Sequence, residues 1–306
     1  MEFSHKSVLL KETIESLSIK PDGIYVDGTT GGAGHSLEIA KRLKSGKLIC
    51  LDKDPDAVAV AKERLVGYPV TVVLTDFKDM DKALYELGID KVDGILLDLG
   101  VSSYQLDNAE RGFTYKTQAP LDMRMSKSGV SAKDLVNTLS ADELTRIFSV
   151  YGEEKFAFKI ANSIVKIRQD IEIETTTQLA DIIARCYPAS QRRDGNPARK
   201  CFQAIRIAVN SELDSLSEAL DKAFRLLNKD GTLSIITFHS LEDRMVKQKF
   251  KDYCTGCTCP PDLPICVCGK KPRGKLAFKK PISATQEELQ ENKRSRSAKL
   301  RTIIKI

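Results

Sequence analysis

Short apolar runs and segments of helical periodicity alternate along the first hundred residues of this chain. Because strands that are separated by helices must run parallel, the alternation predicts a βαβ series, with helices on both faces of a parallel sheet. Ligands of such sheets bind beyond the carboxyl ends of the strands. The expected strands cover residues 23–27, 47–52, 70–75 and 92–98, and the expected helices cover 8–18, 35–44, 55–66 and 79–87.

The turn after the first expected strand is rich in glycine and spans residues 27–35, Asp-Gly-Thr-Thr-Gly-Gly-Ala-Gly-His. Glycines let backbone N–H groups approach a ligand closely, and the start of the following helix adds partial positive charge. No lysine follows the last glycine, so the turn lacks the pattern of a phosphate-binding P-loop. These features predict a nucleotide-type ligand, although glycines alone can also form only a tight turn.

Acidic residues follow each of the four expected strands, at Asp27, Asp52, Asp76 and Asp98. Asp52 lies 18 residues after Gly34, close to the spacing of about 20 at which an acidic residue meets ribose hydroxyls. This pattern predicts a site for a ligand that carries a ribose. S-adenosylmethionine fits that description, and NAD remains possible.

The alternation stops after Asp98, and residues 108–196 show helical patterns without strands. We expect a small helical insertion there, which would act as a substrate-recognition domain, between two parts of an α/β core at 1–107 and 197–306. A long helix over 197–227, a strand over 233–238 and a last strand over 298–306 would complete a doubly wound sheet. The helices expected in the insertion cover 131–137, 141–150, 153–169 and 176–186.

The net charge of +6 is mildly basic and compatible with a nucleic-acid partner. Basic residues gather at 192–193, 199–200, 270–273 and 293–296, although each group alone is typical of a solvated surface. No apolar run approaches the roughly 18 residues that a membrane span needs. The first residues do not resemble a signal peptide, so a cytoplasmic protein without a membrane partner is expected.

Five of the eight cysteines lie within residues 254–268. Prolines interrupt this stretch, so the thiols are not expected to pack in a core. The spacing is similar to that of a zinc knuckle, and it predicts structural zinc on Cys254, Cys257, Cys266 and Cys268, with Cys259 as a spare thiol. Redox pairing and unliganded surface thiols remain the alternatives.

Several longer blocks carry a resemblance to one known family. They are residues 30–35, 98–107, 111–113, 120–125, 196–199, 238–244 and 294–301. Through these blocks the chain is similar over nearly its whole length to the bacterial small-subunit rRNA (cytosine-N4)-methyltransferases. The resemblance implies an enzyme of the class I methyltransferase fold, with an inserted helical domain, that uses S-adenosylmethionine to methylate the exocyclic amine of one cytidine in the decoding region of 16S rRNA.

The same resemblance implies which residues contact the cofactor. In this chain Ala33 stands where many relatives have glycine, although alanine is small enough to keep the loop. Asp52 would accept hydrogen bonds from the ribose hydroxyls, and Phe77 would pack on adenine. The full set of implied contacts is Ala33, Gly34, His35, Asp52, Phe77, Asp98 and Gln105.

The residues that touch the target base are a separate hypothesis. An exocyclic cytosine amine is a poor nucleophile, so a hydrogen-bond acceptor beside it would favour transfer. Either Asp98 or Ser102 would be that acceptor, or Asp98 would serve the methionine end of the cofactor. Phe113, Tyr115 and Arg124 are candidates for stacking on an extruded base, and packing of the insertion is the alternative role for them.

Two other functions stay open at this point. An NAD-dependent oxidoreductase has a similar sheet, but no residue suited to hydride transfer can be placed. A non-catalytic RNA-binding or ribosome-assembly factor would not need the run of Asp27, Gly34, Asp52 and Asp98. Titration with the cofactors would separate these alternatives from a methyltransferase.

Overall fold

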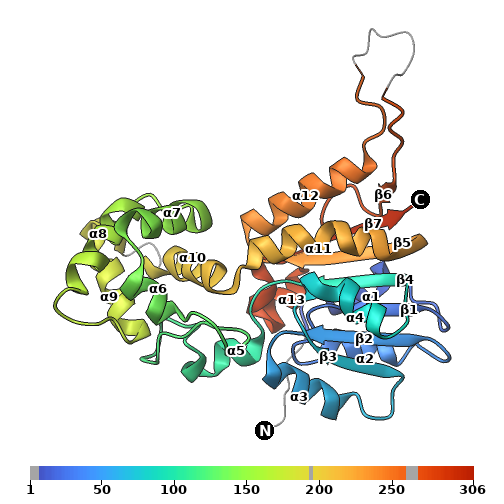
Figure 1. Cartoon of the computed structure of the whole chain (residues 1–306), viewed down its shortest axis with the longest axis horizontal. Coiled ribbons are helices and arrows are strands. Elements are labelled where there is room, and N and C mark those ends of the chain that lie inside the picture. Colours follow the sequence, from blue (N-terminus) through green and yellow to red (C-terminus); the bar gives the residue numbers. More distant parts are fainter. Residues whose placement is uncertain (1–6, 193–195, 260–267) are drawn as a thin grey trace. The chain divides into compact units, whose positions relative to one another are not determined.

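The computed structural model describes residues 7–192, 196–259 and 268–306 (Figure 1). The chain divides into two compact units. The first unit contains residues 1–100 and 214–306 and holds the sheet, and the second contains residues 101–213 and is helical. The predicted cysteine ligand Cys266 lies outside the described residues. Within the described residues, no helix is both long and apolar enough to cross a membrane.

The first unit is built on a seven-stranded sheet in the order β3-β2-β1-β4-β5-β7-β6. The first five strands in that order pair in parallel, and β7 is antiparallel to both of its neighbours. The strand order reverses between β1 and β4, which is where an open α/β sheet offers its binding crevice. The strands are β1 (Ile24–Asp27), β2 (Lys47–Asp52), β3 (Val70–Leu74), β4 (Val92–Asp98), β5 (Leu227–Thr237), β6 (Gly274–Leu276) and β7 (Lys299–Lys305).

Helices cover both faces of this sheet, as the alternation of the sequence predicts. Side chains along each strand alternate between the faces, so Tyr25 and Leu48 pack on one side while Val26 and Ile49 pack on the other. One face packs against α1 (Leu10–Ser16), α2 (Gly34–Ala40) and α3 (Pro55–Arg64). The other packs against α4 (Met80–Glu86), α11 (Glu212–Leu226) and α12 (Ser240–Cys254).

Short elements complete the first unit. The 3-10 turn η1 (Phe77–Asp79) follows β3, and α13 (Gln286–Glu291) and η4 (Lys293–Ser297) precede β7. The segment before α1 contacts the C-terminal part of the chain, because Val8 and Leu9 pack with Ile236 and Leu300. The start of α1 is therefore packed against β5 and β7.

The second unit is helical and has its own apolar core, which includes Phe148, Ile160 and Phe202. Four of its described helices begin with a capping box, in which the side chains of Ser102, Ser131, Ser140 and Thr175 accept from backbone N–H groups of the first turn. Its elements are α5 (Ser103–Asp107), η2 (Ala109–Arg111), α6 (Ala132–Thr138), α7 (Ala141–Gly152), α8 (Ala157–Ile167), α9 (Thr176–Cys186), η3 (Ala189–Arg192) and α10 (Ala198–Asn210).

The long helix expected over 197–227 is instead two helices, α10 and α11, which separate at Ser211. Ser211 has a left-handed φ of 49°. Phe202 of α10 packs in the core of the helical unit, whereas Leu216 of α11 packs against the sheet. The unit boundaries therefore lie at 100/101 and 213/214, rather than at 107/108 and 196/197.

Candidate cofactor site at the strand ends

The glycine-rich turn joins β1 to α2 in the first unit. Ala33 precedes α2 with a left-handed φ of 59°, and Gly31 also has a positive φ, of 49°. A Cβ at Gly34 would lie 2.0 Å from Ser7 Oγ, and one at Gly28 would lie 2.5 Å from Leu97 Cδ2. A larger residue at either position would need a neighbouring side chain to move, and the absence of a Cβ at Gly28 lets the loop backbone lie close to Leu97 of the sheet.

Asp27 ties this loop to the helix behind it. Its buried carboxylate accepts the Ser36 hydroxyl at 2.6 Å and the Thr29 N–H at 3.1 Å. Burial raises the pKa of Asp27 to about 6, despite these hydrogen bonds. Asp27 is thus a structural anchor, and its two contacts shape the loop from within.

Asp52, at the end of β2, contacts the same loop. Its Oδ2 accepts the Gly31 N–H at 2.8 Å, and its Oδ1 accepts the Asp54 N–H at 2.8 Å. Burial raises the pKa of Asp52 to about 6. Each carboxylate oxygen has a second lone pair, so both oxygens can still accept a hydroxyl group from a ligand.

Asp98 ends β4 beside the first turn of α2. Its Oδ2 lies 3.6 Å from Nδ1 of His35. The Asp98 side chain keeps 23% exposure, yet its Oδ1 is buried without a hydrogen-bond partner in the described structure. Burial raises the pKa of Asp98 well above its ordinary value, and the nearby charges of Asp27 and Glu242 raise it further. An unsatisfied buried acceptor at a strand end suits a charged or hydrogen-bonding ligand.

His35 is a neutral imidazole in this site. Burial lowers its pKa to about 4. Its Nε2 lies 3.0 Å from the carbonyl oxygen of Val8, which can only accept, so Nε2 carries the proton. Nδ1 therefore presents a lone pair to Asp98.

Phe77 follows β3 and packs in the core on the α4, α11 and α12 face of the sheet. A Cβ at Gly28 would lie 3.1 Å from the Phe77 Cβ, so Phe77 stands against the start of the glycine-rich turn. The neighbouring Asp76 bonds to Lys53 at 3.3 Å and caps the turn at Lys78 N. Of these two residues, Asp76 has a structural role and Phe77 lies against the candidate site.

Two contacts of this site are not apparent from the sequence. The Asp98 N–H donates to Thr29 Oγ1 at 2.6 Å, which joins the ends of β1 and β4. Arg64 of α3 donates to the Gly32 carbonyl at 2.6 Å. For Thr29, only its position in the glycine-rich turn indicates that it belongs to the site. For Arg64, nothing in the neighbouring sequence indicates the contact with Gly32.

Ser102 and Gln105 lie in the second unit, where they form a capping box for α5. Ser102 Oγ accepts the Gln105 N–H at 3.2 Å, and Gln105 Oε1 accepts the Ser102 N–H at 3.1 Å. The buried Gln105 side chain is thus engaged with the start of its own helix. Both residues hold the local conformation of the chain that follows β4.

Comparison with known proteins decides the family. Residues 2–306 match the MraW methylase family. The chain belongs to that family. It is 57% identical over 311 residues to "Ribosomal RNA small subunit methyltransferase H" of Lachnospira eligens, covering 100% of this chain and 99% of the relative. It is 58% identical over 309 residues to the protein of the same name from Clostridium botulinum strain Loch Maree, covering both chains completely.

Among solved structures, a putative rRNA methylase from Clostridium thermocellum aligns with 99% of this chain and 100% of its own, at 13% identity and a TM-score of 0.46. The strand order of the sheet in this chain confirms the predicted doubly wound α/β class. Membership of a methylase family excludes the NAD-dependent oxidoreductase that the sequence alone left open.

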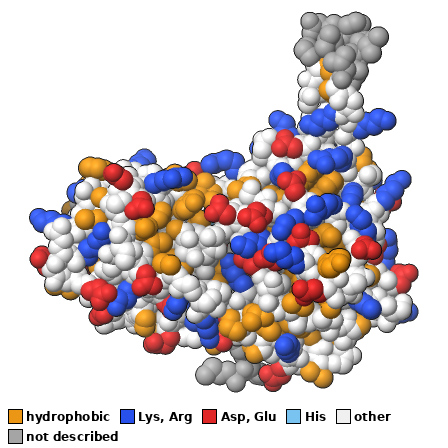
Figure 2. Space-filling model, viewed as in Figure 1, with side chains coloured by type: hydrophobic (Ala, Val, Ile, Leu, Met, Phe, Trp, Pro, Cys, Tyr) orange, Lys and Arg blue, Asp and Glu red, His pale blue; other side chains and the backbone are white. Residues whose placement is uncertain are grey.

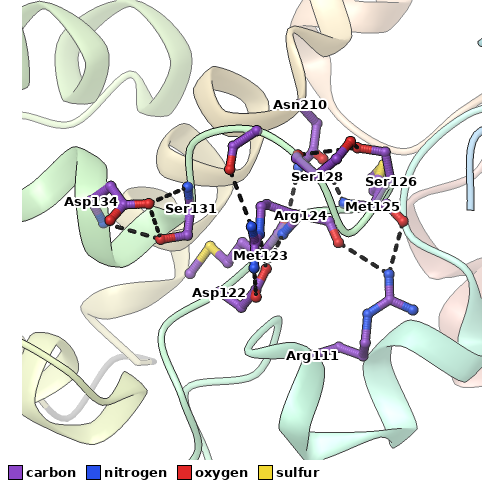
Figure 3. Close-up of polar contacts among 11 residues, drawn as sticks. Arg111, Asp122, Met123, Arg124, Met125, Ser126, Ser128, Ser131, Asp134 and Asn210 are labelled. Atoms are coloured by element: carbon purple, nitrogen blue, oxygen red, sulfur yellow. Dashed lines mark hydrogen bonds and ion pairs between the residues drawn. The ribbon is translucent and has the colours of Figure 1, made fainter.

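The methylase block at 120–125 forms a tight polar network in the second unit (Figure 3). Arg124 makes a two-pronged ion pair with Asp122, at 2.9 Å from Nε and 2.7 Å from Nη2. The buried Arg111 guanidinium donates to the carbonyl oxygens of Arg124 and Met125, at 3.0 and 2.9 Å. Asn210 clamps the same loop, accepting from Met125 N and donating to the Met123 carbonyl, each at 2.7 Å.

The three stacking candidates all make contacts inside the helical unit of this methylase. Phe113 is buried in its core, and Tyr115 meets Phe202 edge to face, with ring centroids 5.4 Å apart. Arg124 is held by Asp122. These contacts favour the packing role for Phe113 and Tyr115 over the stacking role.

The structure brings together a different set of thiols from the one that the spacing predicts. The Sγ atoms of Cys257, Cys259 and Cys268 lie within 4.8 Å of one another, whereas Cys254 is outside this group. Cys254 ends α12, where its side chain is partly buried. The thiol treated as a spare, Cys259, therefore replaces Cys254 among the described residues.

Proposed function

We propose that this chain transfers a methyl group from S-adenosylmethionine to the N4 amine of a cytidine in the 16S rRNA of the small ribosomal subunit. The observation that carries the proposal is the 57% identity, over full length, to relatives named as small-subunit rRNA methyltransferases. The strand-end site supports it, because it offers the acceptors and the open backbone that such a cofactor needs.

The cofactor would lie over the carboxyl ends of β1, β2 and β4. Asp52 would accept both ribose hydroxyls through its two remaining lone pairs. Phe77 would pack on the adenine, and Ala33, Gly34 and His35 would line the loop against the amino-acid end. A Cβ at Gly32 would meet no atom within 4 Å, which supports an open space beside the loop. Gln105 is proposed as a further contact from the helical unit.

We propose that the protonation state of Asp98 responds to the charge of the bound cofactor. Bound S-adenosylmethionine supplies an electrophilic methyl group on a sulfonium. Because an opposite charge nearby lowers the pKa of a carboxyl, the Asp98 proton would leave when a cation occupies the site. The resulting carboxylate would accept a hydrogen bond from the N4 amine of cytosine and orient its lone pair.

Ser102 is proposed as the second acceptor for the target amine. Its hydroxyl oxygen uses one lone pair for the Gln105 N–H and retains another. Two acceptors would draw both amine hydrogens out of the ring plane, which reduces delocalisation of the nitrogen lone pair. Positioning and exclusion of water would supply most of the remaining rate enhancement.

The helical unit, residues 101–213, is proposed to recognise the RNA. The insertion follows β4, whose end carries Asp98, so its first residues leave directly from the candidate site. A target base in structured RNA must be extruded before its amine can reach a pocket. A separate unit that is linked at this strand end is suited to hold the RNA around such a base.

The decisive experiment follows a radiolabelled methyl group from S-adenosylmethionine into purified small subunits and, in parallel, into free 16S rRNA. Nucleoside analysis should find the label in N4-methylcytidine. Asp52→Asn and Asp98→Asn serve as site variants, with Asp76→Asn as a matched strand-end control. Label in another nucleoside, or none in either RNA while the cofactor still binds, would contradict the proposed substrate.

A further inference from the structure

Between α12 and β6, the described residues 255–259 and 268–273 form a paired segment that extends beyond the end of α12 (Figure 1). Its base is closed by the Arg273 N–H, which donates to the Tyr253 carbonyl at 2.8 Å. The Arg273 guanidinium also lies over the Tyr253 ring, at 5.2 Å from the centroid. Beyond this base, described residues on both sides of positions 260–267 carry the thiols of Cys257, Cys259 and Cys268.

No apolar core brings these three thiols together in the described part of the segment. Residues 254–259 and 268–273 are all exposed or only partly buried. Ordering such a chain costs conformational entropy, which elsewhere in a protein is offset by buried apolar surface. Small segments that lack a core are usually held by a disulfide or a structural metal.

The distances between the sulfur atoms separate these two possibilities. A disulfide needs about 2.05 Å between sulfurs, whereas Sγ of Cys257 and Sγ of Cys268 are 3.7 Å apart. Two thiolates that bind one tetrahedral zinc ion at about 2.3 Å are separated by about 3.8 Å. The observed spacing is too long for a disulfide between Cys257 and Cys268 and is compatible with sulfurs that share a metal ion.

The backbone around the thiols also suits a metal site. The Cys259 N–H donates to Cys257 Sγ at 3.4 Å, and such a donor stabilises a negatively charged sulfur. Gly269 has a left-handed φ of 59°, so the chain turns directly after Cys268. Lys270 and Lys271 are exposed next to this turn.

We propose that Cys257, Cys259 and Cys268 bind a structural zinc ion that clasps the segment between α12 and β6. These three thiols lose their protons to solvent as they bind, and no electron transfer is involved. A fourth ligand completes the tetrahedron from outside this group. Cys254, at the end of α12, does not belong to the site.

The clasp would rigidify a basic projection of the sheet-bearing unit. Figure 2 shows several Lys and Arg side chains around the base of this projection. Lys251, Lys270 and Lys271 are exposed there. The metal would have a structural role and would not enter methyl transfer.

Metal analysis of the full-length protein tests this inference. The protein is purified under reducing conditions without chelators, and its metals are measured by mass spectrometry. We expect about one zinc ion per chain, and loss of this zinc in the double variant Cys257→Ser/Cys268→Ser. Cys254→Ser is the matched control and should keep the metal. A wild-type protein that neither contains zinc nor takes up added zinc or cobalt would overturn the inference, as would iron in its place or zinc retained by the double variant.

A second readout follows the clasp itself. Zinc removal should increase the rate of tryptic cleavage after Lys270, and added zinc should restore protection. The circular dichroism melting curve should change little, because the three thiols lie outside the apolar cores. Cleavage at an unchanged rate after zinc removal would show that the metal does not hold this segment.

Discussion

The carboxyl group of Asp98 faces the lone pair of His35 Nδ1, with 3.6 Å between Nδ1 and Oδ2. His35 donates its only ring proton, on Nε2, to the Val8 carbonyl. An ionised Asp98 would therefore place negative charge against a lone pair, whereas a protonated Asp98 offers a hydrogen to it. The raised pKa of Asp98 also favours its protonated form, and a cation bound beside it would favour the ionised form instead.

The first prediction concerns proton release. Burial raises the pKa of Asp98 well above its ordinary value in the free protein, which favours the protonated form of this carboxyl. Binding of cationic S-adenosylmethionine should lower that pKa and release up to about one proton. Calorimetry in buffers of different ionisation enthalpy measures the number released. Asp98→Asn should release none at this position, and a wild-type titration without net proton release would refute the assignment.

S-adenosylhomocysteine gives the matched ligand for that experiment, since it lacks the sulfonium charge but keeps the amino group. Less proton release with this ligand would place Asp98 near the sulfonium. Equal release would place it near the amino group.

The second prediction concerns the pH dependence of cofactor affinity. The pKa of Asp52 is raised to about 6 in the free protein. Only the ionised carboxylate accepts both ribose hydroxyls fully. The affinity for the cofactor should therefore increase as the pH rises through about 6, and it should be lower at more acidic pH. Asp52→Asn should weaken binding by about 1.5–3 kcal/mol above pH 7. The same variant should lose the part of the pH dependence of cofactor affinity that comes from Asp52. If the affinity of Asp52→Asn changes with pH as that of the wild type does, this ribose contact is ruled out.

The third prediction separates the two roles of Ser102. Glycine is nearly as good an N-cap as serine, whereas alanine costs about 1 kcal/mol. If the hydroxyl accepts from the target amine as proposed, Ser102→Gly and Ser102→Ala should both lower kcat by roughly tenfold, equivalent to about 1.4 kcal/mol. A kcat that is retained in Ser102→Gly but lost in Ser102→Ala would leave Ser102 with only its capping role.

The fourth prediction concerns the break between α10 and α11. Ser211 is exposed and has a left-handed φ of 49°. Glycine adopts this conformation without the steric cost of a Cβ, so Ser211→Gly should stabilise the protein by roughly 0.5–1 kcal/mol. Ser211→Ala keeps the Cβ and should give no such gain. Chemical denaturation measures both variants, and a destabilised Ser211→Gly would contradict this account of the break.

The sheet and its loop were accessible from the sequence because their signals are local. Each of β1 to β4 is a short apolar run, and Asp52 follows Gly34 at the expected spacing. The break at Ser211 was missed because α10 and α11 continue one 3.6-residue period. Their apolar faces pack in different units, which no local pattern reveals.

Contacts between distant residues could not be predicted in the same way. His35 and Asp98 come from different elements, and their facing groups and shifted pKa values depend on burial in the folded unit. For the cysteines, the spacing predicted a metal site that stays a prediction, and it did not indicate which of the described thiols lie together, namely Cys257, Cys259 and Cys268. Cys254 ends α12 and is not part of this group.

Strands β4 and β5 are neighbours in the sheet, yet residues 99–226 separate them in the chain. The helical unit makes its contacts within residues 101–213, so it can fold before β5 reaches its partner. Until then, the edge of β4 keeps its hydrogen-bonding groups unpaired, and the apolar residues of the half-sheet stay partly uncovered. During synthesis, the interval before β5 pairs with β4 would be the stage at which the chain is most prone to aggregate.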